Sequence, residues 1–412
     1  MRPSAPARAA APRARRAATA DVAIVGGGIA GCAAAWFLAN EGLDVLLLER
    51  DALASAASGA AAGMLAPVAE GVPGSPLLAL GLAALARFPA LCDELRAASG
   101  VDPELERSGL LRAAESPDAA RALAARADAL RAAGVAVEWL DAAAARALEP
   151  ALAPHVEGAI WSGGDAHVRP PLLARAFARG AERRGARIAL GVDVRGLLAE
   201  GGRICGVRAE GAIAGDVAAG AVVVCAGAWS RALEGWMEAA LPEVRGADGA
   251  ARAAPPPVEP VRGQILALGA PLPRSRAIVW GEGGLYLVPK RDGSLVVGAT
   301  EERVGFDARV TAAGVAALLE GARRLVPALG EAEVLRCWAG LRPASPDGLP
   351  SIGALRGVEG LVVAYGHHRN GVLLAPTTGE LVRDLVLGKA GAAEAAPFDP
   401  ARFARPPAPQ RR

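Results

Sequence analysis

The sequence has almost no excess of charge of either sign. Its 412 residues include 45 Lys and Arg against 43 Asp and Glu, a formal net charge of +2. A chain that binds nucleic acid or an anionic membrane through its overall field carries a basic excess, which is missing here. It also has no uncharged apolar run of the 18 or more residues that a membrane-spanning helix needs. We therefore expect no nucleic acid and no membrane as partner.

Cysteine and histidine are scarce and are not spaced as metal ligands. The five cysteines form no CxxC pair and stand mostly in apolar runs, and the four histidines have no HxH or HExxH spacing. We predict no metal site. Scattered thiols in apolar runs are typical of buried cysteines in a reducing compartment, which favours a cytoplasmic location.

The first 20 residues contain no acidic side chain and are rich in Arg, Ala and Pro. The pair Arg15–Arg16 is similar to a twin-arginine signal, but no separate apolar segment or cleavage site follows it. We expect a disordered basic extension over residues 1–20, with a transit peptide as the alternative. The Pro-rich residues 404–412 are expected to form a tail.

A glycine-rich turn between two apolar runs is the most informative segment. Residues 22–25 lead into Gly26-Gly27-Gly28-Ile29-Ala30-Gly31, an alanine-rich helical stretch and a second run that ends in Glu49. Strand, turn, helix, strand and acid in this order indicate a dinucleotide-binding unit. A tight strand–helix turn with a solvated Glu is the alternative.

Each glycine of this turn has an expected role. Gly26 permits the tight turn, Gly28 lets the backbone approach a pyrophosphate, and Gly31 lets the helix pack on the strand. The N–H groups at the helix start are expected to face the phosphates. Glu49 is placed to accept hydrogen bonds from an adenosine ribose.

Hydrophobic spacing predicts the other elements. Residues 77–150 have leucine and alanine at helical spacing, whereas 258–335 alternate in period two, which predicts an antiparallel sheet. Further helices are expected over 170–184, 311–325 and from about 371 to 387, and further strands over 221–225, 264–268, 285–289, 294–298 and 361–364.

Only one complete dinucleotide motif is present. A flavoprotein that takes electrons from NAD(P)H generally needs two such sites, so one site favours electrons taken directly from an organic substrate. A second glycine-rich turn, 366–371, lies near the C-terminus and is expected to return beside the first turn in a doubly wound sheet. A helix N-terminus there would stabilise the negative charge of a reduced flavin.

Several motifs in a fixed order carry a resemblance to a known family. They are GGGIAG at 26–31, AAAGML at 60–65, the stretch 222–230, VRG at 261–263, YLVP at 286–289, VVGAT at 296–300, WAGLRP at 338–343, and GHHRNG at 366–371 with LLAP at 373–376. With them the chain resembles the D-amino-acid-oxidase-type FAD-dependent oxidoreductases, and within these the glycine oxidases of thiamine biosynthesis. The resemblance covers residues from about 21 to 390.

The resemblance implies an α/β fold with two domains. A discontinuous Rossmann-type FAD-binding domain is expected over 21–100, 158–255 and 336–403. A substrate domain with a mixed or antiparallel sheet is expected over 101–157 and 256–335.

Three residues are implied in catalysis. Arg342 would hold the substrate carboxylate with its planar donor set, and Tyr286 would donate its hydroxyl to the same group. Arg369 would lie beside the flavin and the substrate. The alternatives are a structural arginine in a loop for Arg342, a core aromatic for Tyr286 and a capping role for Arg369.

The resemblance also implies non-covalent FAD as cofactor, with Val194 pairing its backbone with the adenine and Met64 along the flavin or pocket wall. The implied cofactor-binding residues are Gly26, Gly28, Ile29, Ala30, Gly31, Glu49, Arg50, Ser58, Ala61, Gly63, Met64, Val194, Ala226, Gly227, Trp229, Gly366, His367, His368, Arg369, Asn370, Gly371, Val372 and Leu373.

Three positions depart from the family pattern. Gly284 stands where well-known glycine oxidases have a pocket histidine, and Glu301 stands where a methionine is expected. Related sarcosine oxidases bind flavin through a cysteine near the position of Gly340, and the nearest cysteine here is Cys337.

The implied reaction is oxidative deamination of glycine and of small D- or N-methyl amino acids, with hydride transfer to flavin N5 and reoxidation by O2 to hydrogen peroxide. Thiazole synthase is the implied partner that takes the imine. A homo-oligomer is expected, with a homotetramer as one form. The alternatives are a quinone-linked D-amino-acid or N-methyl-amino-acid dehydrogenase, and a nucleotide-binding scaffold or sensor without turnover.

Overall fold

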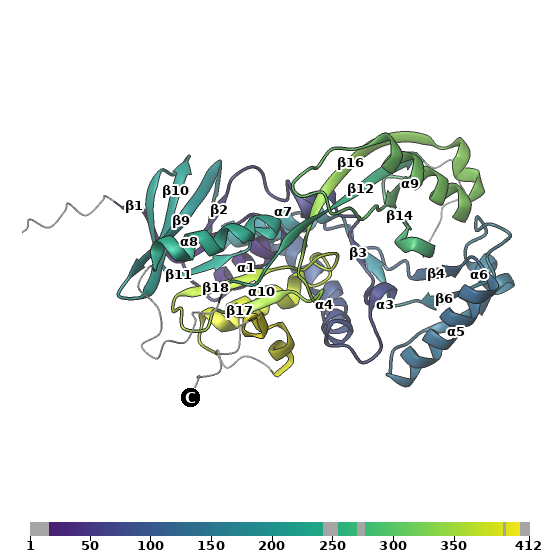
Figure 1. Ribbon diagram of the computed structural model, residues 1–412, viewed down its shortest axis with the longest axis horizontal. Coiled ribbons are helices and arrows are strands. Elements are labelled where there is room, and N and C mark those ends of the chain that lie inside the picture. The colour runs from purple at the N-terminus through teal and green to yellow at the C-terminus, as the bar shows by residue number, and fades with distance from the viewer. Residues whose placement is uncertain (1–15, 242–253, 270–276, 390–392, 404–412) are drawn as a thin grey trace, which may run out of the picture.

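The structure, a computed structural model, describes residues 16–241, 254–269, 277–389 and 393–403. Within these residues the strands form two eight-stranded sheets and one two-stranded sheet. Figure 1 shows the two large sheets next to each other along the long axis of the molecule, with helices packed on both. This is the two-part α/β arrangement expected from the sequence.

The first sheet has the parallel centre of a dinucleotide-binding domain. Its strands are β1 Arg16–Val25, β2 Val45–Glu49, β8 Arg187–Leu190, β9 Val192–Glu200, β10 Arg203–Gly211, β11 Gly215–Val224, β17 Ser351–Ala354 and β18 Leu361–Tyr365. β1 pairs in parallel with β2 and with β11, and β18 pairs in parallel with β11. The turn after β18 therefore returns close to the turn after β1, as predicted.

β1 begins earlier than the sequence suggested. It starts at Arg16, and Ala18, Thr19 and Ala20 pair with residues of β11. β11 is long because it also forms a hairpin with β10, so its edge offers hydrogen-bonding groups that these residues satisfy. The expected disordered extension over 1–20 is therefore wrong for residues 16–20, and residues 1–15 lie outside the described part.

The helices cover both faces of the first sheet and pack on the second. They are α1 Ile29–Asn40, α2 Ala57–Ala60, α3 Pro67–Glu70, α4 Pro76–Ser99, α5 Pro117–Ala132, α6 Ala142–Leu148, α7 Pro170–Arg183, α8 Leu233–Ala240, α9 Ala312–Leu325 and α10 Ala375–Val386. Short 3-10 helices are η1 Gly227–Ala232, η2 Glu282–Gly284, η3 Pro327–Glu331, η4 Ala393–Phe398 and η5 Pro400–Phe403. α1 is apolar on all sides because it lies between the sheet, α7 and α10.

The second sheet is mixed. Its strands are β4 Leu110–Ala114, β5 Glu138–Asp141, β6 Gly158–Ser162, β12 Glu259–Gly269, β13 Ile278–Trp280, β14 Tyr286–Pro289, β15 Ser294–Gly298 and β16 Glu333–Ala344. β13 pairs in parallel with β4, and the other pairs are antiparallel. The separate two-stranded sheet consists of β3 Met64–Leu65 and β7 Ala166–His167.

Two strands lie in the other sheet from the one expected. β6 pairs with β4 and β5, although 158–255 was assigned to the FAD-binding domain. β16 pairs with β12 along its whole length and crosses the expected boundary at 336. The stretch 77–150 also contains two short strands, β4 and β5, besides its helices. Strand partners far away in sequence decide these assignments, and the local spacing does not show them.

Of the described helices, α4 alone is long and apolar enough to cross a membrane by length and composition. This is weak evidence, because a core helix of a soluble protein passes the same test. Leu78, Phe88 and Leu95 of α4 are buried, and the helix packs on α7 and α10.

Candidate active site

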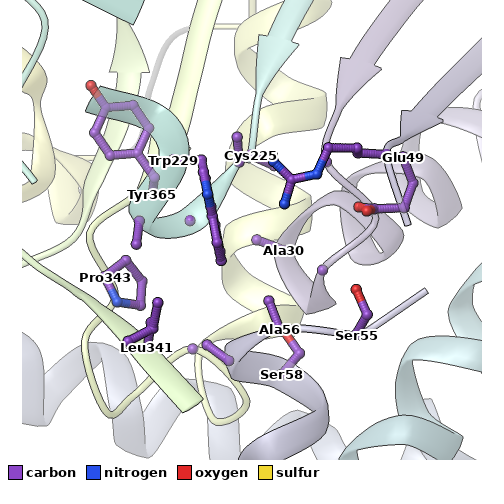
Figure 2. Close-up of a pocket in the computed structure, with 18 of the residues that line it drawn as sticks. Ala30, Glu49, Ser55, Ala56, Ser58, Cys225, Trp229, Leu341, Pro343 and Tyr365 are labelled. Carbon is purple, nitrogen blue, oxygen red and sulfur yellow. The ribbon is translucent and has the colours of Figure 1, made fainter. Parts of the chain in front are cut away.

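A cavity of about 880 Å³ opens at the carboxyl ends of β1, β2, β11 and β18. In an open parallel sheet, ligands bind at this edge, where the strand order reverses. Figure 2 shows residues from all four strands or the turns after them around the cavity, among them Ala30, Glu49, Cys225, Trp229 and Tyr365. The dinucleotide motif therefore borders this cavity.

The glycines of the first turn are required for different reasons. Gly26 has φ +107°, and a Cβ there would come within 2.6 Å of the Cys225 carbonyl oxygen. A Cβ on Gly31 would overlap the carbonyl oxygen of Gly26. Gly28 has an ordinary φ of −72°, and its nearest neighbour would be Ser58 Oγ at 3.4 Å. The protein itself thus excludes side chains at Gly26 and Gly31 but tolerates one at Gly28, which faces the cavity.

The start of α1 and Glu49 are fixed by hydrogen bonds. Ile29 N–H donates to Ser58 Oγ at 2.9 Å. The Glu49 carboxylate accepts from Gly27 N–H at 2.6 Å and from Asp51 N–H at 2.8 Å. A carboxylate has further lone pairs, so Glu49 can still accept from a hydroxyl in the cavity.

Most of the implied cofactor-binding residues surround this cavity. Those that line it are Gly26, Gly28, Ile29, Ala30, Glu49, Arg50, Ser58, Ala61, Val194, Ala226, Gly227, Trp229, His367, His368, Arg369, Gly371 and Val372. Gly63 and Met64 line a second, adjoining cavity. Gly31, Gly366, Asn370 and Leu373 line neither; Gly31 supports the turn and Leu373 lies in the core.

The second cavity is small, about 70 Å³, and lies beside the first. The two share lining residues, which are Ala57, Ala61, Gly340, His368, Arg369 and Val372. Tyr286 and Arg342 line only the small cavity. The structure therefore brings all three predicted catalytic residues to one place, although they are far apart in sequence.

Arg342 is a half-buried cation without a carboxylate partner among the described residues. In the described part of the chain it forms no ion pair; its Nη1 donates to the Thr300 carbonyl oxygen at 3.0 Å, and its guanidinium also hydrogen-bonds with the Tyr286 hydroxyl. Burial lowers the pKa of the Arg342 guanidinium, but arginine remains charged in proteins. A cation that is partly removed from water and has no carboxylate partner is costly, so this group is suited to receive an anion.

Tyr286 lies next to this cation. Its side chain is buried, and its ring covers Gly298, where a Cβ would come within 2.5 Å of Cζ. Burial raises the pKa of the Tyr286 hydroxyl, and Arg342 and Arg369 oppose the shift only in part. The hydroxyl is therefore protonated near neutral pH and can donate a hydrogen bond.

Arg369 differs from Arg342 because two carboxylates already engage it. Its Nε lies 2.8 Å from Glu70 Oε1, and its Nη1 lies 3.4 Å from Glu301 Oε2. The guanidinium also lies over the Trp280 ring, 5.1 Å from its centroid. Arg369 also faces Gly284: a Cβ added at Gly284 would lie 3.6 Å from Arg369 Nη1.

His367 and His368 are adjacent in sequence but have different surroundings. His367 Nε2 lies 2.9 Å from Thr378 Oγ1, so this ring joins the turn to α10. His368 lines both cavities, and among the described residues its Nε2 has no hydrogen-bond partner. Burial lowers the pKa of both rings to about 4, so both are neutral at pH 7.

Sequence reasoning missed several contributors. Glu70 holds Arg369, and Lys290 donates to the Ala62 carbonyl at 2.5 Å, which fixes the loop that carries Gly63. Phe306 and Ala308 line the large cavity. No local signal marks them, because each reaches the site from a segment distant in sequence. Cys337 lines neither cavity and packs with the core of the second sheet.

Comparison with known proteins identifies the family. The family described as FAD dependent oxidoreductase (DAO) matches residues 21–385. The chain belongs to this family. FAD is therefore its cofactor, and the large cavity fits it: the turn leaves Gly28 open to the cavity, and Glu49 retains acceptor capacity. Among the described residues no group of three His, Cys, Asp or Glu could hold a metal ion.

Relatives and solved structures in the family are similar over nearly the whole chain. Glycine oxidase of Geobacillus kaustophilus is 38% identical over 92% of this chain and 96% of the relative, and its crystal structure superimposes with a TM-score of 0.85 over 93% of this chain and 99% of that chain. The crystal structure of glycine oxidase from Bacillus cereus gives 0.81 at 34% identity, over 90% and 96%. The bifunctional protein ThiO/ThiG of Trichormus variabilis is 34% identical over 90% of this chain but only 53% of the relative. These likenesses confirm the expected fold and FAD.

Proposed function

We propose that this FAD-dependent oxidoreductase oxidises glycine, and with it small D- and N-methyl amino acids, by oxidative deamination. The observation that carries the proposal is Arg342, a half-buried guanidinium that has no carboxylate partner among the described residues and lies beside the Tyr286 hydroxyl in a cavity of about 70 Å³. A guanidinium binds a carboxylate with two parallel hydrogen bonds. The small cavity favours a substrate with little or no side chain, and relatives named glycine oxidase support the same substrate.

Arg342 binds the substrate carboxylate, and its contact with the Thr300 carbonyl sets the direction of the guanidinium. Tyr286 donates its hydroxyl to the same carboxylate, and the high pKa of the phenol keeps the proton in place. We assign Arg369 to positioning, because Glu70 and Glu301 already neutralise it. It holds the cavity wall and does not bind the carboxylate.

FAD, when bound, accepts the two electrons that the substrate loses. The substrate amine enters as the free base, and none of the residues lining the small cavity is a strong base. His368 is a neutral imidazole whose pKa of about 4 makes it a weak proton acceptor at pH 7. Because the His368 ring is neutral, it adds no positive charge to the cavity. The imine product leaves the site or, where no partner takes it, hydrolyses to glyoxylate and ammonia, and O2 is reduced to hydrogen peroxide.

Further parts of the proposal concern setting and partners. FAD is bound non-covalently, because Cys337 lines neither cavity and a Cβ at Gly340 would come within 2.5 Å of Ala60 Cβ. The imine is passed to thiazole synthase; the bifunctional ThiO/ThiG relatives, which this chain matches over 53% of their length, support such a partner. We further propose a cytoplasmic homo-oligomer, for which a homotetramer is one form.

The test is peroxide release under air from glycine, sarcosine and both enantiomers of alanine. We expect peroxide with glycine and no turnover with L-alanine, because holding carboxylate and amine fixed turns the L-Cα–H away from the oxidising face. Turnover with a quinone acceptor but no peroxide would favour the dehydrogenase alternative. Turnover of a bulky D-amino acid without turnover of glycine would overturn the assigned substrate.

A further inference from the structure

A loop from the second sheet reaches the FAD cavity of the first. Residues 299–311 connect β15 to α9, and within this loop Phe306 and Ala308 line the large cavity. The Phe306 side chain is also partly open to solvent, because the residue is 41% exposed. An exposed phenylalanine at the border of a cavity has apolar surface that a ligand can cover.

Phe306 meets an aromatic residue of the cofactor domain. Its ring centroid lies 5.3 Å from that of Trp229, and the two planes are inclined by 43°. Trp229 also contacts Arg50, whose Cζ lies 5.2 Å from the ring centroid. All three residues line the large cavity, and Figure 2 shows Trp229 beside it. They come from three separate segments of the chain.

The loop is tied to β12 by a charged network. Arg262, only 5% exposed, pairs with Glu302 at 2.5 Å and with Asp307 at 3.1 Å. Gln264 donates to Glu302 at 2.8 Å and accepts from Thr311 N–H at 2.7 Å. The bond from Arg262 holds the pKa of Glu302 down at about 2, so the pair stays charged. The loop that carries Phe306 is thus held to β12 on both sides of this residue: at Glu302 before it, and at Asp307 and Thr311 after it.

We propose that Phe306, stacked on Trp229 and held by the Arg262–Asp307 pair, closes over FAD in the large cavity and slows its release. The inference rests on the family cofactor and does not depend on which amino acid is oxidised. Phe306 is the covering group, and Arg262 and Asp307 act through it as positioning residues. The loop therefore makes FAD retention depend on the second sheet as well as on the glycine turn.

The test compares Phe306→Ala with Val310→Ala. Val310 is on the same loop, is 39% exposed and lines neither cavity. Protein freed of FAD is titrated with FAD, the quenching of flavin fluorescence gives Kd, and the release rate is measured after dilution. We expect Kd to rise about tenfold in Phe306→Ala, because the apolar surface that the ring would bury against FAD is lost. Val310→Ala should stay within about twofold of the wild type.

Two further measurements separate retention from folding. The melting temperature of the FAD-free protein should be similar in wild type and Phe306→Ala, and Phe306→Leu, which keeps apolar volume, should show a smaller rise in Kd. Asp307→Asn weakens the tether without unpairing Arg262 from Glu302, so it should raise Kd by a few-fold. An unchanged Kd in Phe306→Ala, or an equal rise in Val310→Ala, would overturn the proposal. Glycine turnover is not part of the readout, so the two proposals fail separately.

Discussion

The guanidinium of Arg342 lies against Gly263 on the neighbouring strand, where an added Cβ would come within 2.5 Å of Cζ. β12 and β16 pair with Val261 opposite Arg342, which places Gly263 two residues further on the same face. Tyr286 covers Gly298 of β15 in the same manner. Two glycines thus leave the space in which the Arg342 and Tyr286 side chains lie.

Gly263→Ala is predicted to displace Arg342 and to lower kcat/KM for glycine by about 10- to 100-fold, because a misplacement of about 1 Å can cost 10²-fold. FAD content should remain normal. Gly269→Ala is the matched control on the same strand, since its Cβ would have its nearest neighbour at 3.4 Å. Equal activity of the two variants in steady-state assays would show that Gly263 does not position Arg342.

Arg342→Met and Arg369→Met are predicted to differ. Loss of the carboxylate partner costs ~2–5 kcal/mol, so Arg342→Met should lower kcat/KM for glycine by at least about 30-fold. Arg369→Met should affect glycine less but should lower the melting temperature, because it leaves Glu70 and Glu301 without their cation. A larger loss of kcat/KM in Arg369→Met would reverse the two assignments.

Gly28→Ala and Gly31→Ala are predicted to fail at different stages. A Cβ at Gly31 overlaps the Gly26 carbonyl, so this variant should lose stability even without FAD. A Cβ at Gly28 meets only Ser58 Oγ at 3.4 Å, so that variant should fold normally but bind FAD more weakly. Melting curves of the FAD-free proteins and FAD titrations distinguish the cases. Normal FAD affinity in Gly28→Ala would contradict the assigned approach of the backbone to the cofactor.

Protonation of the buried His367 ring is predicted to lower the free energy of unfolding in acid. Burial lowers its pKa from 6.5 to about 4, so the unfolded chain binds more protons between these values. The contribution of neutral His367 to the free energy of unfolding is therefore fully present above pH 6.5. It is lost as the pH falls from 6.5 through 4, by about 3 kcal/mol in all. His367→Gln can still bond to Thr378 and should lose this component. Denaturant unfolding of both proteins from pH 7.5 to 4.5 is the test, and parallel curves would refute the assignment.

The elements that local spacing determines were predicted well. The unit from residue 22 to Glu49 appears as β1, α1 and β2, and the helices expected over 170–184 and 311–325 appear as α7 and α9. Their apolar faces are complete within short windows, so the sequence alone reveals them. The resemblance also named Arg342, Tyr286 and Arg369, which the structure brings to one cavity.

Features that depend on partners distant in sequence could not be predicted. The ion pairs of Arg369 involve Glu70 and Glu301, and the space for Arg342 comes from a glycine on another strand. The helix after the second glycine turn begins at Ala375, later than expected, because residues 371–374 form turns first. Cross-strand register and loop tethers decide such contacts, and neither has a local pattern.

The most direct test of the central claim is to add glycine to the FAD-loaded protein without oxygen, follow the flavin absorbance, and then admit air. The account predicts that glycine bleaches the flavin absorbance, that Arg342→Met slows this bleaching by at least about 30-fold, and that air restores the absorbance with release of hydrogen peroxide. Absorbance that glycine leaves unchanged, while a bulky D-amino acid bleaches it, would contradict the account.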